Sequence, residues 1–600
     1  MHSPKFPIKA KSLSDVINVS RLKTTWKARV RDAMRRQPIP DSLEHLDFHV
    51  RLDAICTTIE AEVLTGAYIP NSPIRFLSEK SKGLCRQLVI PSVKDALILQ
   101  TLSDALWSEI RTKAPTKKSF YAPSDHQFSK IIKGHANEYG SVNAWLAFQE
   151  SIFGFAKSKK FIVVTDIANY YDSISYDHLR NILADLSLAR EHALDLLTYA
   201  LSWMLWQPDY MPRVPIGLPQ SNLDAPRLLA HSFLFEIDEL LSLRPKIDFA
   251  RYMDDIDIGV DSVSEAKEIL RDLDLALQTR QVRLNSGKTR ILTEAEAVRH
   301  FKIRENLLLD KLAEKIETNR SLGKSNLREK CKIELAIRAG MRRRTFEVGN
   351  GEKILKRLVN LGRPLHADIN DDVFYSLLCG WPALRQTVLN WWQNRVAPET
   401  KLPLIVDLFS KGTLVDDAAK MDIAVAIVSA RLEKCKFVND HIAAILKYLD
   451  HTSSWGLYSK LWLLSKYGSD AEVMSLIEST VSLWVTQEHL SRLVARLYPR
   501  FVGSPLRVKF EAIIRRAGNA WSASVLQFHN ELSSGTVGYT AIKAFVFAKN
   551  TSLPNTISHA KFLMLLSLLH NPDIAPTAVA NLKTVHNWAL TDEYYAHIAP

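Results

Sequence analysis

The chain has 600 residues, of which 46% are hydrophobic and 24% charged, and its formal net charge is +13 at pH 7. This length exceeds what one hydrophobic core supports, so we expect about two to four domains. No stretch of about 20 residues is apolar and free of charge, which argues against a membrane-spanning helix, and the N-terminus lacks the apolar run of a secretory signal. Five scattered cysteines without a CxxC pair argue against structural zinc and disulfides and favour a reducing compartment.

The positive charge is unevenly distributed along the chain. Residues 1–360 hold 55 Lys and Arg against 45 Asp and Glu, whereas residues 361–600 hold 23 against 20. Residues 1–44 form a basic extension in which LKTTWKARVRDAMRR predicts an amphipathic helix, either a solvated face or a contact to a nucleic-acid backbone. The charge alone is equally consistent with a nucleic-acid partner and with a soluble basic surface.

Residues 45–67 carry apolar side chains at helical spacing, and a basic strand follows them. In KGLCRQLVIPSVKDALILQ the short strand LVI is flanked by Lys82, Arg86 and Lys94, and a helix is predicted from about Asp95. Basic side chains on a small sheet suit the triphosphate of a nucleotide, although basic loops are common in any protein.

A second strand-like run, FIVVTD, delivers Asp166 at its end. Tyr170 and Tyr171 come four and five residues later, and a helix is predicted from Ser175 or Asp177. Residues 215–241 read as a loop rich in Gly and Pro that leads into a helix with an apolar face.

The run IDFARYMDDIDIGV predicts a β-hairpin with Asp254 and Asp255 in its turn. Carboxylates that converge from separate strands make a site for two divalent metal ions, which is the machinery of nucleotidyl transfer. The alternative is that they are helix-capping or solvated carboxylates. We interpret the neighbouring Asp257 as a surface residue of the hairpin and Asp172 as a helix-start or loop residue. The segment VRLNSGKTRIL (282–292) predicts a strand, a turn and a second strand, with Lys288 beside the turn.

The remainder of the chain reads as helical. Residues 301–365 are basic, and residues 366–600 show successive short amphipathic helices that suggest a solenoid-like array. The clearest of these cover residues 371–381, 384–393, 441–450, 457–467, 541–549 and 560–569. No repeat period can be fixed from the sequence.

These segments, taken in order, resemble the reverse transcriptases of the bacterial group II intron and retron lineage. KGLCRQLVIPSVKDALILQ resembles the fingers motif, FIVVTDIANYYDSI motif A, GLPQSNLDA motif B, ARYMDDIDI motif C and VRLNSGKTRIL motif D. The resemblance implies an α+β right-hand polymerase, with fingers and palm over residues 45–300 and a thumb over 301–365, followed by an all-α C-terminal domain over 366–600. The helical extension looks similar to defence-associated, abortive-infection-type members, which implies a role in antiphage defence.

The resemblance also implies roles for individual residues. Asp166, Asp254 and Asp255 would bind two Mg²⁺ ions, or Mn²⁺, with the Ile167 carbonyl as a further ligand. Tyr171 occupies the place of the steric gate that rejects a ribose 2′-hydroxyl, and Tyr170 would be a core residue. Lys82 and Arg86 would contact the triphosphate, Gln220 would lie against the nascent base pair, and Lys288 would protonate the pyrophosphate leaving group or contact a phosphate.

One departure from the family pattern concerns motif B, which usually reads PQG. Here Ser221 and Asn222 follow Gln220, so the backbone loses the close approach that Gly allows. This puts ordinary templated processivity in doubt, and synthesis without a template is an alternative.

The partners implied are dNTPs, RNA (including a dedicated noncoding RNA), a DNA product, further copies of this chain and a companion defence protein, with no membrane, in the bacterial cytoplasm. The rival functions are an intron maturase, a non-catalytic RNA-binding scaffold on a palm fold, and an RNA polymerase.

Overall fold

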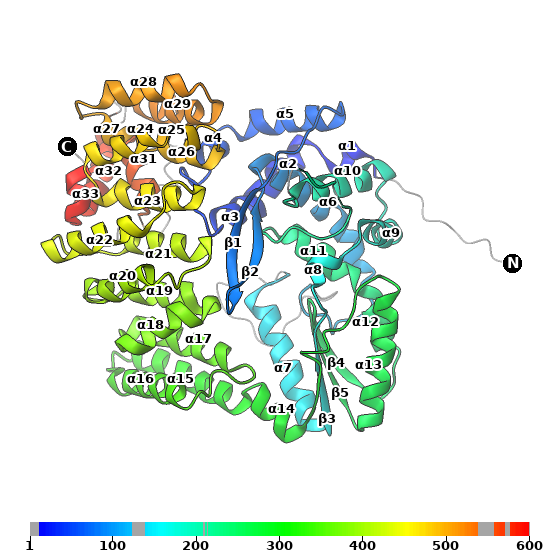
Figure 1. Ribbon diagram of the computed structural model, residues 1–600. Helices are drawn as coiled ribbons and strands as arrows, with labels where there is room; N and C mark the ends of the chain where they lie inside the picture. Colours follow the sequence, from blue (N-terminus) through cyan, green and yellow to red (C-terminus); the bar gives the residue numbers. More distant parts are fainter. Residues whose placement is uncertain are drawn as a thin grey trace.

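The protein is described here from a computed structural model. It covers residues 11–122, 139–207, 210–212, 214–537, 557–570 and 576–598. Figure 1 shows that a long stack of helices forms one side of the molecule and a small sheet flanked by helices forms the other, with a β-hairpin between them.

The N-terminal region is helical and forms part of the core. Its helices are α1 (Leu13–Val16), α2 (Val19–Thr25), the π-helical turn η1 (Trp26–Val30), α3 (Arg31–Arg35), α4 (Leu46–Val50) and α5 (Leu52–Leu64). From α2 to α3 the apolar residues Leu22, Trp26, Val30 and Met34 share one buried face. The predicted amphipathic helix is therefore confirmed, and it packs against α5 and the long helix α6 (Val93–Thr112).

The basic strand belongs to a two-stranded antiparallel hairpin, β1 (Ile74–Ser81) and β2 (Leu84–Ile90). The prediction found only the end of β2 and missed β1, whose sequence IRFLSEKS does not alternate cleanly between apolar and polar residues. Helix α6 (Val93–Thr112) follows, and the Ser92 side chain caps its N-terminus by accepting a hydrogen bond from the Asp95 amide.

A four-stranded antiparallel sheet with the order β4-β5-β3-β6 forms the centre of the region that the sequence predicts to be the palm. Its strands are β3 (Phe161–Thr165), β4 (Asp248–Tyr252), β5 (Asp255–Val260) and β6 (Arg290–Thr293). Successive residues of a strand face opposite sides, and here Ile162 packs with the apolar residues of α7 (Val142–Ser158), whereas Val163 packs with those of α13 (Val263–Gln278). The two helices flank the sheet in Figure 1. Of the strands predicted over 282–292, only the second is formed, as β6.

Six further helices complete this region. They are α8 (Tyr170–Ser173), α9 (Tyr176–Leu186), α10 (Glu191–Met204), α11 (Asp224–Phe233), α12 (Phe235–Ser242) and α14 (Glu294–His300). Helix α9 starts directly after Ser175, as predicted. Tyr170 is buried, and its hydroxyl donates a hydrogen bond to the Ala230 carbonyl, which confirms that it is a core residue.

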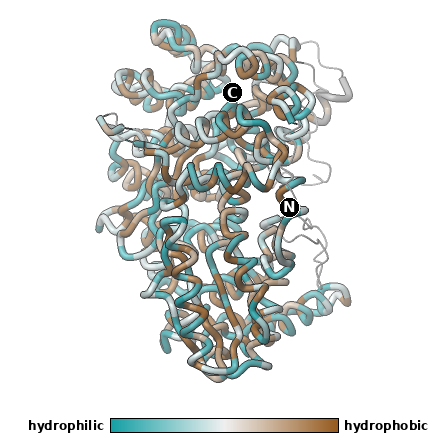
Figure 2. The backbone as a smooth tube through the Cα atoms, turned by 90° about the vertical axis from the view of Figure 1, so that its right-hand side faces the viewer, coloured by the Kyte–Doolittle hydropathy of each residue, from teal (hydrophilic) through white to brown (hydrophobic). Residues whose placement is uncertain are grey.

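From residue 303 to the C-terminus every described regular element is a helix. They are α15 (Ile303–Ser321), α16 (Leu327–Arg342), α17 (Gly351–Gly362), η2 (Arg363–Leu365), α18 (Asp371–Gly380), η3 (Pro382–Leu384), α19 (Arg385–Gln393), η4 (Pro398–Lys401), α20 (Leu402–Ser410), α21 (Asp417–Ser429), α22 (Lys436–Tyr448), α23 (Ser454–Tyr467), α24 (Asp470–Ser479), α25 (Val481–Trp484), α26 (Glu488–Ala495), α27 (Tyr498–Phe501), α28 (Arg507–Ala517), α29 (Ala520–Ser534), α31 (His559–Leu569), α32 (Pro576–Ala589) and α33 (Glu593–Ile598). The prediction of a helical C-terminal region is confirmed, while the helix predicted over 541–549 lies outside the described residues. Teal and brown alternate along many of these helices in Figure 2, as amphipathic helices require.

One hydrophobic core runs through this whole helical stack. A single cluster of buried residues extends from Leu309 to Ile598 and also includes Phe76 of the β-hairpin and Leu43 and Leu46 of the N-terminal region. The boundary predicted between residues 365 and 366 therefore has no counterpart in the packing of the core.

The β1–β2 hairpin is fixed to the helical stack by buried polar contacts. The amides of Leu77 and Glu79, on the free edge of β1, donate hydrogen bonds to Asp417 and Asp416 at the N-terminus of α21. Arg385 forms ion pairs with Glu79 (3.2 Å) and Asp416 (3.1 Å), and all three side chains are almost completely buried. The edge of the hairpin is thus covered by a helix terminus rather than left open.

Within the described residues no helix is long and apolar enough to span a membrane. All five cysteines are free thiols.

Candidate active site

The β4–β5 hairpin places Asp254 at its tip. Tyr252 pairs with Asp255 across the ladder, which leaves Met253 and Asp254 as a two-residue turn. Met253 adopts a left-handed conformation with φ of +59°, which is costly for a residue with a long side chain. The turn is held by Arg251, whose guanidinium donates a hydrogen bond to the Met253 carbonyl (2.9 Å).

Arg251, which supports the turn, is a site residue that the sequence analysis did not identify. It is completely buried and forms a two-pronged ion pair with Asp238 of α12, with Nε–Oδ1 and Nη2–Oδ2 distances of 2.6 and 2.5 Å. Arg251 is part of the run ARYMDD, but no sequence pattern indicates that it pairs with Asp238, 13 residues earlier.

Asp166 follows β3, the strand beside β5, and so lies near Asp254. Its carbonyl accepts a hydrogen bond from the Asn285 amide (2.7 Å), and its carboxylate is paired with the Lys288 ammonium. Ile167 forms an isolated bridge with Leu284, which ties the same segment to the turn that carries Lys288. Motifs A, C and D therefore meet at one place, as the order of the motifs predicts.

The carboxylates interact strongly with one another. Burial, then the charge of Asp255, then that of Asp166 raise the pKa of Asp254 to about 7. Burial also raises the pKa of Asp255, against the opposing effect of Lys353. Crowded carboxylates that resist ionisation in this way are stabilised by a divalent cation, and their hard oxygen atoms are the ligands that Mg²⁺ prefers.

The donor chemistry therefore fits a divalent metal. Among the described residues, however, no three His, Cys, Asp or Glu side chains converge closely enough to enclose an ion as they stand. Asp166 and Asp254 would supply the ligands facing the cleft, and Lys288 would have to release Asp166 for an ion to bind there.

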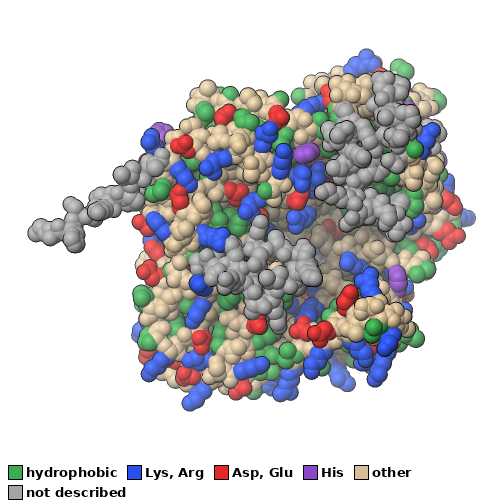
Figure 3. Space-filling view, turned by 180° about the vertical axis from the view of Figure 1, so that it is seen from behind, with side chains coloured by type: hydrophobic (Ala, Val, Ile, Leu, Met, Phe, Trp, Pro, Cys, Tyr) green, Lys and Arg blue, Asp and Glu red, His purple; other side chains and the backbone are tan. Residues whose placement is uncertain are grey.

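A cleft of about 940 Å³ brings most of the predicted site residues together. It is lined by residues from β2, β3–α8, the loop before α11, the β4–β5 turn and the 285–288 turn. The predicted residues among them are Arg86, Asp166, Ile167, Tyr171, Gln220, Asp254 and Lys288. Figure 3 shows hollowed surface on the back face of the molecule, with Lys and Arg side chains around it.

Asp255 does not line this cleft. It lies in a separate pocket of about 120 Å³ together with Asp257, Trp145 and Lys353. Asp255 and Asp257 are two residues apart on β5 and therefore point to the same side of the sheet, whereas Asp254 belongs to the turn and faces the cleft. The metal-binding role predicted for Asp255 stays a prediction, and the structure favours Asp254 as the ligand of the pair. The interpretation of Asp257 as a surface residue is wrong, because it is 5% exposed.

Lys82 also lies outside the cleft. It occupies the turn of the β1–β2 hairpin with φ of +50°, and Lys80 lines the cleft in its place. Sequence reasoning missed Lys80 because it missed β1, in which Lys80 lies two residues from Ser78, the cross-strand partner of Arg86. Arg227, on α11, is a second cationic side chain of the cleft that the motifs did not indicate.

The motif B loop is held by contacts on both sides. The Tyr171 carbonyl accepts a hydrogen bond from the Leu218 amide (2.7 Å), and the Gln220 carbonyl accepts one from the Val89 amide of β2 (3.0 Å). The Gln220 side chain donates to Asp172 (3.3 Å). These contacts join the β1–β2 hairpin, the Tyr171 segment and the loop into one wall of the cleft.

Residues 79–317 match the family model described as reverse transcriptase (RNA-dependent DNA polymerase). The chain contains a reverse transcriptase domain. It is therefore an RNA-directed DNA polymerase, a nucleotidyltransferase, and the four-stranded sheet belongs to the palm fold of these polymerases. The matched residues make up less than half of the chain. A comparison of the chain with curated proteins found no match.

Replacing Arg86 or Lys80 of the reverse transcriptase by Ala is expected to raise the KM for dNTP about tenfold, because each removes a charge-assisted contact to phosphate. Lys82→Ala should leave KM unchanged, since Lys82 points from the hairpin turn outside the cleft. Steady-state dNTP titrations of the three variants test this assignment. Equal effects of Lys80→Ala and Lys82→Ala would contradict it.

Proposed function

We propose that this protein is a divalent-metal-dependent reverse transcriptase that acts in bacterial antiphage defence. The observation that carries the polymerase part is the cleft, in which Asp166 and Asp254 lie together with the cations Arg86 and Lys80 and the ring of Tyr171. The defence part rests on the resemblance of the helical extension to that of abortive-infection enzymes. In this proposal the fingers and palm lie within residues 45–300, the thumb begins with α15 and packs continuously with the C-terminal helices, and the enzyme works in the bacterial cytoplasm.

The residues of the cleft divide the work of the reaction. A bound Mg²⁺ pair would supply charge neutralisation at the reacting phosphate and activation of the attacking hydroxyl. Asp166 and Asp254 would hold the ions, while Arg86 and Lys80 would bind and orient the triphosphate. Lys288, with its side chain about half exposed beside Asp166, is placed to donate a proton to the leaving pyrophosphate.

The thumb-like helices offer the surface for nucleic acid. Helices α15 and α16 present exposed cationic side chains, and Lys and Arg gather at the lower right of Figure 3, where these helices lie. The exposed residues of the two helices are Arg304, Lys311, Lys315, Arg320, Arg328, Lys332, Arg338 and Arg342, and Lys324 is exposed in the turn between them. We propose that they contact the phosphate backbone of an RNA template or of the DNA product.

The test is to sequence the nucleic acid that copurifies with the wild type and with an Asp254→Ala variant, with and without DNase and RNase treatment. DNA present only with the wild type supports the proposal. Its sequence then distinguishes a copied RNA from a tract made without a template. The same RNA in both samples, with no DNA even during phage infection, would contradict the proposal and favour an RNA-binding scaffold.

Tyr171→Ala is expected to lower the preference for dNTP over NTP about 100-fold, because the ring lines the nucleotide cleft and would collide with a 2′-hydroxyl. Competition between dATP and ATP in primer extension measures the change. Tyr170→Phe is the control, since Tyr170 is buried and its hydroxyl binds the Ala230 carbonyl. If Tyr171→Ala kept the wild-type preference for dNTP over NTP, Tyr171 would not be the steric gate.

A further inference from the structure

A second cavity, of about 340 Å³, lies away from the catalytic carboxylates, and we name it the junction pocket. Three parts of the chain that are distant in sequence line it: residues 34–55, residues 71–94 and residues 455–524. Its volume lies in the range of sites that bind small molecules, and such sites are common where domains meet. None of the reverse transcriptase motifs accounts for it.

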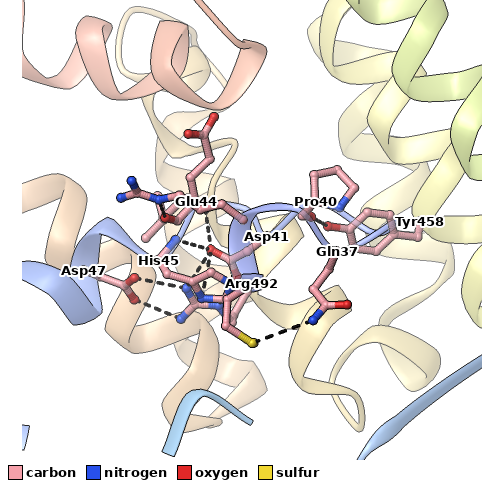
Figure 4. A network of polar contacts seen from close by, with 11 residues as sticks. Gln37, Pro40, Asp41, Glu44, His45, Asp47, Tyr458 and Arg492 are labelled. Atoms are coloured by element: carbon pink, nitrogen blue, oxygen red, sulfur yellow. Dashed lines mark hydrogen bonds and ion pairs between the residues drawn. The ribbon is translucent and has the colours of Figure 1, made fainter. Parts of the chain in front are cut away.

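The positive charges in the wall of the junction pocket are already neutralised. Arg492 of α26 pairs with Asp41 and Asp47 (3.0 Å each), as Figure 4 shows. The other two cations that line the pocket are also paired, Arg51 with Glu531 (2.6 Å) and Lys94 with Glu62 (3.0 Å). Binding of a phosphate group here would require breaking one of these pairs, so the wall disfavours anions.

Glu488 is the carboxylate of the pocket wall that is left without an ion pair among the described residues, since Asp41 and Asp47 are paired with Arg492. Its carboxylate lines the pocket, and no hydrogen bond or ion pair from a described residue reaches it. Burial raises its pKa, because the charged form loses contact with water. A ligand that donates N–H groups would compensate this loss. The aromatic residues Phe48, Trp455 and Tyr458 also line the pocket and provide apolar surface for a flat ligand.

We propose that the junction pocket binds a phosphate-free purine of the guanine type, a nucleobase or nucleoside, with Glu488 as its recognition residue. The Watson–Crick edge of guanine carries two adjacent N–H donors, which a carboxylate accepts side by side. The uncharged heterocycle would pack against the apolar walls. Because the ligand carries no phosphate, the ion pairs of Arg51, Lys94 and Arg492 stay intact.

The junction pocket adjoins the catalytic cleft through the segment 36–40. Gln37 lines both cavities. Asn222 of motif B donates a hydrogen bond to the Arg36 carbonyl (2.5 Å), and Tyr458 of α23 donates one to the Pro40 carbonyl (2.5 Å). A ligand in the junction pocket therefore contacts the same short segment that supports motif B, and we expect it to change the rate of nucleotide incorporation. This coupling rests on the proposed polymerase function, whereas the binding does not.

The test is calorimetric titration of the full chain with guanosine and with GMP. Guanosine should bind, and GMP should bind at least about tenfold more weakly because of its phosphate. Glu488→Gln should weaken guanosine binding about tenfold or more, since it replaces a charged acceptor by an amide. Glu478→Gln, which removes an exposed carboxylate paired with Lys509 on α28, is the matched control and should bind like the wild type.

Two further variants keep the proposal testable if Glu488→Gln does not fold. Ser524→Phe fills the junction pocket from α29 and should abolish binding. Asp254→Asn, with its altered catalytic cleft, should bind guanosine as the wild type does, which separates this site from the polymerase reaction. No binding of guanosine at millimolar concentration, equal binding by Glu488→Gln, or tighter binding of GMP would overturn the site. Binding that leaves the incorporation rate unchanged would overturn the coupling.

Discussion

Replacing Asp254 by Asn is expected to lower the rate of DNA synthesis about 1,000-fold, which corresponds to about 4 kcal/mol of lost transition-state stabilisation. Asp254 is the carboxylate of the YMDD turn that faces the cleft beside Asp166, and an amide cannot hold a divalent cation as a carboxylate does. Primer extension with purified protein measures the loss. Asp261→Asn, at the far end of the same hairpin, is the control and should retain full activity.

The same substitution should change how stability depends on pH. The pKa of Asp254 rises from 3.8 to about 7 on folding. Between these values the folded chain binds a proton that the unfolded chain has released, so stability falls as pH rises through this window. Asp254→Asn removes the ionisation and should flatten this slope. Urea unfolding at pH 5 and pH 8 measures it, and an unchanged slope would show that Asp254 is not the responsible group.

Arg251→Met is expected to destabilise the protein by about 3–5 kcal/mol, because it leaves Asp238 charged and unpaired in the core. The double variant Arg251→Met/Asp238→Leu removes both charges and should recover most of this loss. Denaturant unfolding of the two variants measures both effects. If the double variant were as unstable as the single one, the ion pair would not be the source of the loss.

The double variant also separates stability from catalysis. Arg251 donates to the Met253 carbonyl and supports a turn with a left-handed residue, so DNA synthesis should remain low even where stability is recovered. Full activity of a stable double variant would contradict this positioning role.

Local patterns predicted the parts of the active site that depend on short stretches of chain. The alternation around YMDD gave the hairpin, and the strand FIVVTD gave Asp166 at its end, because both signals arise within about ten residues. Tyr171 and Gln220 followed from the resemblance of their segments to motifs A and B of the reverse transcriptases. Asp254, Asp166, Tyr171 and Gln220 all line the cleft. So do the predicted residues Arg86, Ile167 and Lys288.

Other features depended on contacts between residues distant in the chain. Asp254 and Asp255 are adjacent in sequence, yet they line different pockets, because Asp254 lies in the turn and Asp255 is the first residue of β5. Lys80 replaced Lys82 in the cleft because the pairing of β1 with β2 fixes which side chains face it. Asn222, read as a departure that weakens motif B, has a partner in the Arg36 carbonyl, 186 residues earlier.

The chemistry of this polymerase was thus readable from the order and spacing of its residues, because catalytic groups must sit at the ends of regular elements whose periods the sequence displays. The arrangement of its parts was not. The apolar core that continues from α15 to Ile598, the ion pairs of Arg385 and Arg492, and the junction pocket all arise where segments distant in the sequence pack together. The type of a residue indicates whether it is buried or forms an ion pair, but its partners are determined only by the tertiary structure.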